Sequence, residues 1–323
     1  MTAPALRIGI DLGGTNLRIA RLGGDSAELL EQHKEEVGEP RDPESIVERI
    51  ATLVGRLSPS PVPVGIGIAA MLRDRRGTVA NSPHLRWRDV PFGALLAKRL
   101  GAGYAVGVYN DVNAIVYGEH VFGAARGYRD VLGVYVGTGI GGGVVAGGQL
   151  LEGASNCAAE IGHVKVRWDD DAAACACGQR GCVEAYVGGS YVAKRIAAEL
   201  AAGAPSAAVA LAGRIEDVTP SHVDEAAAAG DPWALALWEE LAPLLAVALG
   251  NALALLNPER LVLGGGLLGR APTLYELVVA TLPLVAPVAS MDAVTVVEAT
   301  LGDDAGIVGA SALAAAGVSI IGA

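Results

Sequence analysis

The sequence predicts an α/β protein built from two lobes, and three observations support this prediction. The chain has 323 residues, which is more than one ordinary hydrophobic core accommodates. Hydrophobic residues make up 52% of the chain but aromatic residues only 4%, so Ala, Val, Leu and Ile supply most of the apolar content. Such a composition suits buried parallel strands covered by helices. A glycine-rich turn follows an apolar strand in each half of the chain, and this weak internal duplication indicates two related lobes.

The first half of the chain predicts a β-hairpin followed by alternating strands and helices. The apolar run 7–11 ends in Asp11, the turn holds Gly13 and Gly14, and the segment 17–22 alternates apolar and polar residues. After the hairpin we expect a strand at 29–37, a helix at 43–57, a strand at 62–70, a polar loop through Pro83 and Trp87, a helix at 94–100 and a strand at 104–110.

The second half repeats the order of strand, glycine turn and strand before it becomes mainly helical. We expect a helix at 113–122, a strand at 131–136, a turn with five glycines at 137–143 and a returning strand at 144–146. Further along we expect a helix at 232–256 that Asn257 and Pro258 stop, a strand at 261–263 that enters three glycines, and a helix of small residues at 305–316.

The charge and cysteine content narrow the class of protein. The formal net charge is −11, and the 24 Lys and Arg residues are scattered singly or in pairs, so a basic stripe for nucleic acid is not expected. No run of 18 uninterrupted apolar residues is present, and residues 1–6 carry no signal-peptide core, which predicts a cytoplasmic protein without a membrane partner. In that compartment the four cysteines are expected to be thiols or metal ligands.

Asp11, Gly13, Gly14, Thr15 and Asn16 form the first candidate nucleotide site. The glycines permit positive φ and close approach, so consecutive backbone N–H groups can converge on a phosphate, and Thr15 and Asn16 add side-chain donors. At the end of its strand, Asp11 can hold a hydrated Mg²⁺. The alternative is a plain tight hairpin with a solvated acid.

A second glycine turn supplies the other end of a triphosphate site. Gly137, Thr138 and Gly139 follow an apolar strand, although a simple hairpin is again the alternative. Gly265, in the run of three glycines after the strand at 261–263, offers a third point of close approach beneath an adenine or a ribose. Taken by itself, that run is also compatible with an ordinary strand-to-helix turn.

Asp111 is the candidate catalytic base. It follows an apolar strand and precedes a helix, so its carboxylate lies between two elements. Phosphoryl transfer asks a protein mainly for positioning and charge stabilisation, with one acid that orients the attacking hydroxyl. The alternative is that Asp111 caps the helix, a role that Asp often fills.

The segment from Glu160 to Glu184 carries the strongest local signal. His163, Cys175, Cys177 and Cys182 supply one imidazole and three thiols, which match a closed tetrahedral Zn²⁺ site of structural type. Buried free thiols or a disulfide of the Cys175–Cys182 type are the alternatives, and Cys157 is interpreted as a small buried residue. Together with Asn110, the acids Glu160 and Glu184 suit the hydroxyls of a polyol. No function is assigned to His33, His120 or His222.

These motifs together resemble the ROK family of sugar kinases, and within it the bacterial glucokinases. The resemblance extends from Ile8 to about Ala316. It rests on the following residues: Asp11 to Asn16, Asn110-Asp111-x-Asn113, Val136 to Gly143, Glu160 to His163, the C-x-C-G-x-x-G-C-x-E segment that begins at Cys175, and Asp304 to Ala310.

The resemblance implies an actin-like ATPase (ribonuclease H-like) fold with a cleft between two α/β lobes. Residues 1–112 plus 303–323 would form the smaller lobe, with the first phosphate loop and the base, and residues 113–302 the larger lobe, with the second phosphate loop, the zinc loop and a dimer surface. It implies ATP with Mg²⁺ and a free hexose as substrates, a structural Zn²⁺, and a homodimer or a dimer of dimers. Asp111 would activate the sugar hydroxyl, and the residues expected to contact the sugar are Asn110, Asp111, Glu160, His163 and Glu184.

Several positions depart from the family pattern and bear on the identity of the hexose. Ala69 and Ala70 stand where Pro-Gly is usual, and Arg73 stands where an acid often follows. His84 replaces an asparagine that normally contacts the sugar, so His84 joins the expected sugar contacts. Asn156 and Ala159 stand where glycines are common, and Ala tolerates positive φ less well than Asn. Glucose is the first expectation, with mannose, fructose, allose and N-acetylmannosamine as alternatives.

Two further classes of protein compete with a kinase. A sugar-sensing regulator of the same family would carry a helix-turn-helix segment before the first phosphate loop, and only seven residues precede Ile8. A structural actin-like filament protein would have no use for the cysteine segment beside Glu160 and Glu184. We therefore expect an enzyme.

Overall fold

The computed structural model describes residues 6–24 and 26–321. The expectation about a signal sequence falls largely on residues 1–5, which lie outside the described residues. The chain divides into two compact units. The first comprises Met1–Arg129, Gly143–Ala158 and Ala299–Ala323, and the second comprises Asp130–Gly142 and Ala159–Glu298.

The first unit is built on one mixed sheet. In spatial order its strands are β14 (Ile320–Ile321), β8 (Val106–Asn110), β4 (Val64–Ile68), β1 (Leu6–Leu12), β2 (Asn16–Gly23) and β3 (Leu29–Glu36). The central strands β1, β4 and β8 run parallel, so their carboxyl ends reach the same edge of the sheet. The predicted hairpin is confirmed, because β1 and β2 pair antiparallel with Asp11 opposite Arg18.

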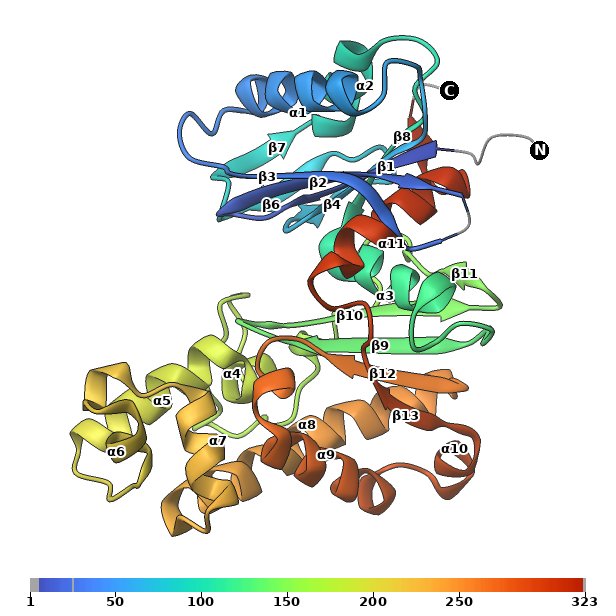
Figure 1. Cartoon of the computed structure of the whole chain (residues 1–323). Coiled ribbons are helices and arrows are strands. Elements are labelled where there is room, and N and C mark those ends of the chain that lie inside the picture. The colour runs from blue at the N-terminus through green and yellow to red at the C-terminus, as the bar shows by residue number, and fades with distance from the viewer. Residues whose placement is uncertain (1–5, 25, 322–323) are drawn as a thin grey trace. The chain divides into compact units, whose positions relative to one another are not determined.

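Helices cover both faces of this sheet. Figure 1 shows α1 (Pro43–Leu57) and α2 (Phe92–Leu100) on one face, and α3 (Asp111–Phe122) and α11 (Ala305–Ala315) on the other. Helix α11 packs unusually close to the sheet. A Cβ on Gly9 would lie 2.0 Å from the carbonyl oxygen of Ile307, and one on Gly65 would lie 1.8 Å from that of Ala310. These two strand positions therefore exclude any larger residue.

The predicted helix at 43–57 has the expected bounds, and its start has a local cause. Asp42 caps α1 by accepting a hydrogen bond of 2.9 Å from the backbone N–H of Ser45, and Pro43 occupies the first turn, where no backbone donor is needed. Ile46, Ile50 and Val54 follow the helical spacing and are fully buried. Helix propensity, capping and burial thus agree over this segment.

The predicted polar loop through Pro83 and Trp87 is wrong in part. This region forms a small antiparallel sheet of β5 (Met71–Leu72), β6 (Val79–Ser82) and β7 (Trp87–Val90). These strands have only two to four residues each, too few to show an alternating pattern in the sequence. Trp87 nevertheless is buried, and its indole N–H donates to the carbonyl oxygen of Arg41 at 2.6 Å.

The second unit has its own parallel strands, β9 (Val131–Val136), β12 (Arg260–Gly264) and β13 (Thr295–Glu298). They pair in the order β9-β12-β13. Strand β10 (Ile140–Ala146) spans the division between the two units, and β11 (Gln149–Leu150) belongs to the first unit. The helices of this unit are α4 (Glu184–Val187), α5 (Gly189–Ala201), α6 (Ala208–Ala212), α7 (Pro220–Ala228), α8 (Pro232–Leu256), α9 (Pro272–Val285) and α10 (Val288–Ala293).

Helix α8 spans the predicted range 232–256 and ends as expected. Asn257 adopts the left-handed conformation at φ 44° and provides the stop. Among the described residues, α8 is long and apolar enough to cross a membrane by length and composition. It packs against α7 and α9, and Leu241, Leu245 and Leu249 are fully buried, which is the behaviour of a core helix.

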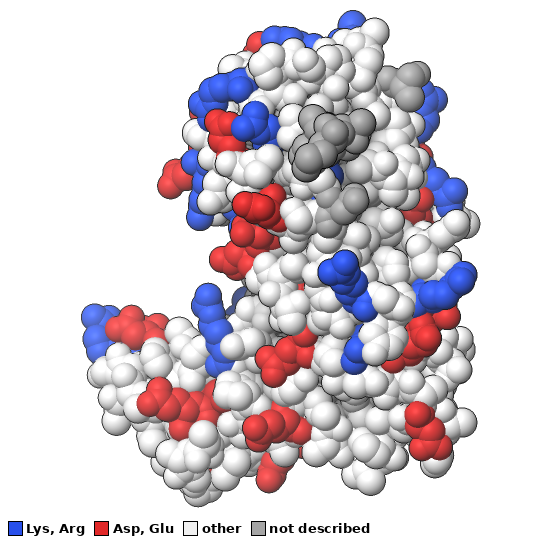
Figure 2. Space-filling view, turned by 45° about the vertical axis from the view of Figure 1, so that its right-hand side comes forward, with Lys and Arg blue, Asp and Glu red and all other residues white. Residues whose placement is uncertain are grey.

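Charged side chains are dispersed over the molecular surface that Figure 2 presents. Lys and Arg side chains stand singly or in small groups among Asp and Glu on this face. With a net charge of −11, any attraction for a phosphate group has to come from local donors rather than from the whole surface.

Candidate functional site

The candidate residues of the first unit gather at the carboxyl edge of its parallel strands. Asp11 pairs in register with Gly67 of β4, which pairs with Tyr109 of β8, so Asn110 and Asp111 follow two strands away. Two strand spacings amount to about 10 Å. Binding sites of open α/β sheets form at this edge because loops from neighbouring strands meet there.

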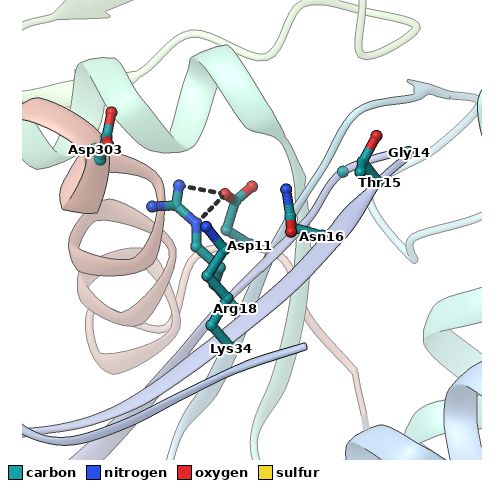
Figure 3. A pocket seen from close by; sticks show the side chains of 8 residues that line it. Asp11, Gly14, Thr15, Asn16, Arg18, Lys34 and Asp303 are labelled. Carbon is teal, nitrogen blue, oxygen red and sulfur yellow. Dashed lines mark hydrogen bonds and ion pairs between the residues drawn. The ribbon is translucent and has the colours of Figure 1, made fainter. Parts of the chain in front are cut away.

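The first glycine turn lines a pocket of about 360 Å³ (Figure 3). Gly13 and Gly14 do not adopt positive φ, contrary to the reason expected for them. Gly14 is required by crowding instead, because a Cβ there would lie 2.4 Å from the Cβ of His84. The residues lining the pocket are Asp11, Gly13, Gly14, Thr15, Asn16, Arg18, Lys34 and Asp303.

Three charged residues of this pocket were missed in the sequence. The guanidinium of Arg18 donates to one carboxylate oxygen of Asp11 through Nη2 at 2.6 Å and Nε at 3.1 Å (Figure 3). Lys34 pairs in register with Arg18 across β2 and β3. Asp303 arrives from the turn before α11. Arg18 could have been predicted from the hairpin, because it stands opposite Asp11 in the strand pairing. No local sequence pattern predicts that Asp303 lies in this pocket.

His84 lies beside the first glycine turn. Arg41 connects the two segments, since its Nη1 donates to the carbonyl oxygen of His84 at 2.7 Å and to that of Gly14 at 3.1 Å. The structure therefore brings His84 next to Gly14 within the first unit. This contact could not be predicted from a local pattern, because 70 positions separate the two residues.

Asn110 and Asp111 form the start of α3. Asn110 is the helix cap, and its Oδ1 accepts from the backbone N–H groups of Val112 at 3.0 Å and Asn113 at 3.1 Å. Asp111 is the first helical residue rather than the cap, which settles the alternative left open for it. Its Oδ1 accepts from the N–H of Val112 at 2.9 Å. The positive end of the helix favours the ionised carboxylate.

The second glycine turn lies in the second unit and is held by backbone hydrogen bonds. The N–H of Gly189 donates to the carbonyl oxygen of Gly137 at 2.8 Å, and that of Ser190 donates to Thr138 at 2.9 Å. Gly265 has φ 94°, and a Cβ there would lie 2.5 Å from the carbonyl oxygen of Val136. Gly265 thus needs both its conformation and its lack of a side chain.

A pocket of about 370 Å³ opens beside this turn. Gly266 rather than Gly265 lines it, with Gly137 and Thr138. The lining residues that the sequence did not suggest are Gly189, Ser190, Thr219, Pro220, Ser221, Leu267 and Arg270. They come from α5, α7 and the turn after β12, and none carries a recognisable local motif.

His163, Cys175, Cys177 and Cys182 form one cluster, in which all potential ligand atoms lie within 4.8 Å of one another. The Sγ of Cys175 is 3.7 Å from Nδ1 of His163, and the Sγ of Cys177 is 3.7 Å from that of Cys182. Sulfur atoms around a tetrahedral zinc are about 3.8 Å apart. The residues therefore fit such an ion. All four cysteines are free thiols, and Cys157 belongs to the other unit.

Glu184 lies between the cysteines and the second glycine turn. Its Oε2 accepts from the backbone N–H of Ile140 at 2.8 Å, and its Oε1 is 3.8 Å from Sγ of Cys175. Glu160 precedes the 3₁₀ turn Ile161–His163 and its side chain reaches solvent. The surrounding protein removes part of its hydration and raises the pKa of Glu160, an effect that His163 opposes and Glu184 reinforces.

The fold and the residues in its loops indicate the class of protein. Parallel strands ending in two glycine-rich phosphate-type turns, with an Asn-Asp pair at the edge of one sheet, are features of the actin-like ATPase fold. The model of the ROK family matches residues 7–316. The chain belongs to the ROK family.

Several individual proteins to which the chain is similar are glucokinases. The chain is 35% identical over 320 residues to the glucokinase of Streptomyces coelicolor, covering 96% of this chain and 97% of that one. It is 34% identical to the glucokinase of Thermotoga maritima, with 95% and 96% covered. A crystal structure of a ROK family glucokinase from Streptomyces griseus, in complex with glucose and AMPPNP, is 33% identical with a TM-score of 0.77, covering 96% of this chain and 99% of that one.

Proposed function

We propose that this chain is an ATP-dependent hexose kinase that converts glucose to glucose 6-phosphate. The observation that carries the proposal is the Asn110-Asp111 pair at the same sheet edge as the first glycine turn. The full-length similarity to glucokinases supports the substrate class, and the Streptomyces griseus structure was obtained with glucose and an ATP analogue.

In this proposal Asp111 acts as the general base. Its carboxylate takes the proton of the C6 hydroxyl while that oxygen attacks the γ-phosphorus of ATP. A bond forms between the sugar oxygen and phosphorus, the bond from phosphorus to the bridging oxygen breaks, and ADP leaves. The carboxylate lies in the first turn of α3, where the helix dipole favours negative charge.

The sugar would be held through hydrogen bonds to its hydroxyls. We assign the hydroxyl contacts to Asn110, Asp111, His84, Glu160, His163 and Glu184. Carboxylates accept hydrogen bonds from hydroxyls, whereas the amide of Asn110 can also donate through Nδ2. A site made of such groups discriminates strongly against a sugar that lacks a matching hydroxyl, because the buried partner is then left unpaired.

We assign the contacts with ATP to residues of the glycine turns. In this assignment Asp11, Gly13, Gly14, Thr15 and Asn16 contact the terminal phosphates, and Gly137, Thr138, Gly139 and Gly265 belong to the other end of the nucleotide site. Arg18 occupies only Oδ2 of Asp11, so Oδ1 remains able to hold a hydrated Mg²⁺. When bound, Mg²⁺ neutralises charge on the phosphates.

We assign His163, Cys175, Cys177 and Cys182 to a structural Zn²⁺. The separations of their ligand atoms support four protein ligands and leave no ligand position for water. The ion would stabilise the loop between Cys175 and Cys182 and thereby orient Glu184, which lies against Cys175. No chemical step involves this metal.

We further propose a cytoplasmic homodimer or dimer of dimers. The second unit carries exposed apolar side chains that support a subunit contact there. Leu255, Leu284 and Val288 are 85%, 83% and 75% exposed. Sedimentation of the purified chain over a range of concentrations tests this, and a monomer at micromolar concentration would contradict it.

The catalytic proposal is tested by coupling ADP production to NADH oxidation over a panel of sugars. We expect glucose to give the highest kcat/KM among glucose, mannose, fructose, allose, N-acetylglucosamine and N-acetylmannosamine. A strong preference for another hexose would identify that sugar, instead of glucose, as the substrate. No phosphorylation of any member of the panel would contradict the enzyme itself.

A further inference from the structure

Two tyrosine hydroxyls hold the loop that carries the cysteines, defined here as the cysteine loop, residues 173–182. The hydroxyl of Tyr191 accepts a hydrogen bond of 2.8 Å from the backbone N–H of Ala176, which lies between Cys175 and Cys177. The hydroxyl of Tyr186 accepts an equally short bond of 2.8 Å from the N–H of Ala173. The two tyrosines therefore support the same loop in the same chemical manner.

Tyr191 belongs to α5, whose backbone contacts the second glycine turn, whereas Tyr186 belongs to α4, which contacts this turn through the side chain of Glu184. Tyr191 is the third residue of α5, and the two residues before it donate their N–H groups to the carbonyl oxygens of Gly137 and Thr138. The contact is tight, because a Cβ on Gly189 would lie 2.4 Å from the carbonyl oxygen of Gly137. The first turn of α5 thus contacts the glycine turn at one end and the cysteine loop through the Tyr191 hydroxyl.

Glu184 forms a second connection between the same two segments. Its two carboxylate oxygens face the N–H of Ile140 and the Sγ of Cys175. Because Glu184 is also assigned to the sugar, a variant there would affect two substrates at once. Tyr191 has no assigned contact with either substrate, so a variant there tests the connection without removing a substrate contact.

We propose that Tyr191 is a positioning residue for the nucleotide, acting through α5 on Gly137, Thr138 and Gly139. Order in the cysteine loop holds the first turn of α5, and that turn holds two carbonyl groups of the glycine turn. Loss of the Tyr191 hydroxyl removes the exposed hydrogen bond from the N–H of Ala176, leaving that N–H to water, and so loosens this connection. The inference rests on the proposed role of the second glycine turn in binding ATP, and it adds the residue that keeps this turn in place.

The test compares Tyr191→Phe with the matched control Tyr186→Phe in the full chain. Each variant removes one hydroxyl that accepts from a backbone N–H of the cysteine loop. We expect Tyr191→Phe to raise the Kd for an ATP analogue and the KM for ATP about fivefold, the effect of one hydrogen bond. We expect its kcat and its Kd for glucose to stay within about twofold of wild type. Tyr186→Phe should leave all these constants close to wild type.

Amide hydrogen exchange supplies a second readout that does not depend on turnover. Exchange at residues 137–140 should accelerate in Tyr191→Phe and not in Tyr186→Phe, with metal content measured and equal in both proteins. Chelation of the metal from the wild-type chain should accelerate exchange at the same residues. This last measurement applies even when a variant folds poorly.

The outcomes separate this inference from the proposed function. Equal losses of ATP affinity in both variants, or no loss in Tyr191→Phe, would overturn the positioning role while the kinase proposal stands. Unchanged exchange at residues 137–140 after chelation would overturn it as well. A wild-type chain that binds no ATP analogue would overturn the proposed function, and the inference with it.

Discussion

The two glycine turns resemble each other in sequence but are stabilised by different interactions. The turn in the first unit lines a pocket with four charged side chains, Asp11, Arg18, Lys34 and Asp303. The turn in the second unit lines a pocket whose polar side chains are hydroxyls apart from Arg270, and backbone bonds from α5 hold it. A shared pattern of strand, glycine turn and strand therefore does not imply a shared electrostatic character.

The glycines themselves differ between the two regions. Gly14 is required because His84 leaves no room for a Cβ, whereas Gly265 combines a positive φ with a carbonyl oxygen at 2.5 Å from a would-be Cβ. We infer that charged neighbouring side chains determine the properties of the first turn, whereas backbone contacts with α5 hold the second. The predictions below test this contrast, beginning with the largest effect.

The largest effect is expected for Asp111→Asn. The variant should fold and bind glucose, and its kcat should fall by about 10²- to 10⁴-fold because the amide cannot take the proton of the sugar hydroxyl. The coupled ADP assay measures kcat, and isothermal titration measures glucose binding. A rate near wild type would remove Asp111 from the mechanism and would leave the first unit with a binding role only.

Removal of the metal is expected to have the next largest effect, confined to the second unit. Prolonged chelation should lower Tm by about 10 °C and weaken glucose binding, because a structural zinc contributes several kcal/mol to folding. Calorimetry and titration of the same samples provide the two measurements, with re-addition of Zn²⁺ as the control. Fresh protein that contains no zinc would contradict the assignment.

Arg18→Gln tests the charged character of the first turn. Two N–H groups of Arg18 donate to Oδ2 of Asp11, so the loss of Arg18 should raise the KM for ATP about tenfold and leave the Kd for glucose nearly unchanged. Arg18→Lys keeps the charge but not the two-pronged contact and should give an intermediate KM. If both variants behave like wild type, the ion pair has no part in binding ATP.

The smallest effect is expected for Ala159→Gly. Ala159 adopts φ 63°, a left-handed conformation that costs an L-residue about 1 kcal/mol, so glycine should raise the free energy of unfolding by up to that amount. Chemical denaturation measures the change, with activity as the control for an intact site. Asn156→Gly, at φ 60°, should gain less because Asn tolerates this conformation better. A lower free energy of unfolding in Ala159→Gly would show that the methyl group of Ala159 makes stabilising contacts.

Much of the local structure was predictable from the sequence. The bounds of α1 and α8 follow from caps, proline positions and helical spacing that lie within the segments themselves. The hairpin around residues 11–16 and the cluster of His163 with three cysteines also follow from nearby residues. The small sheet of β5, β6 and β7 was missed, because its strands are too short to show a period.

What only the tertiary structure decided is which distant side chains meet. Neighbouring residues determine whether a segment turns, coils or extends, since caps, periodicity and glycine act over a few positions. By contrast, the approach of His84 to Gly14, of Asp303 to Asp11 and of Ser190 to Thr138 depends on strand order and helix packing over the whole chain. Close packing of α11 on β1 and β4 illustrates the reason: Gly9 and Gly65 look unremarkable locally, and their necessity comes from carbonyl groups some 250 to 300 positions away.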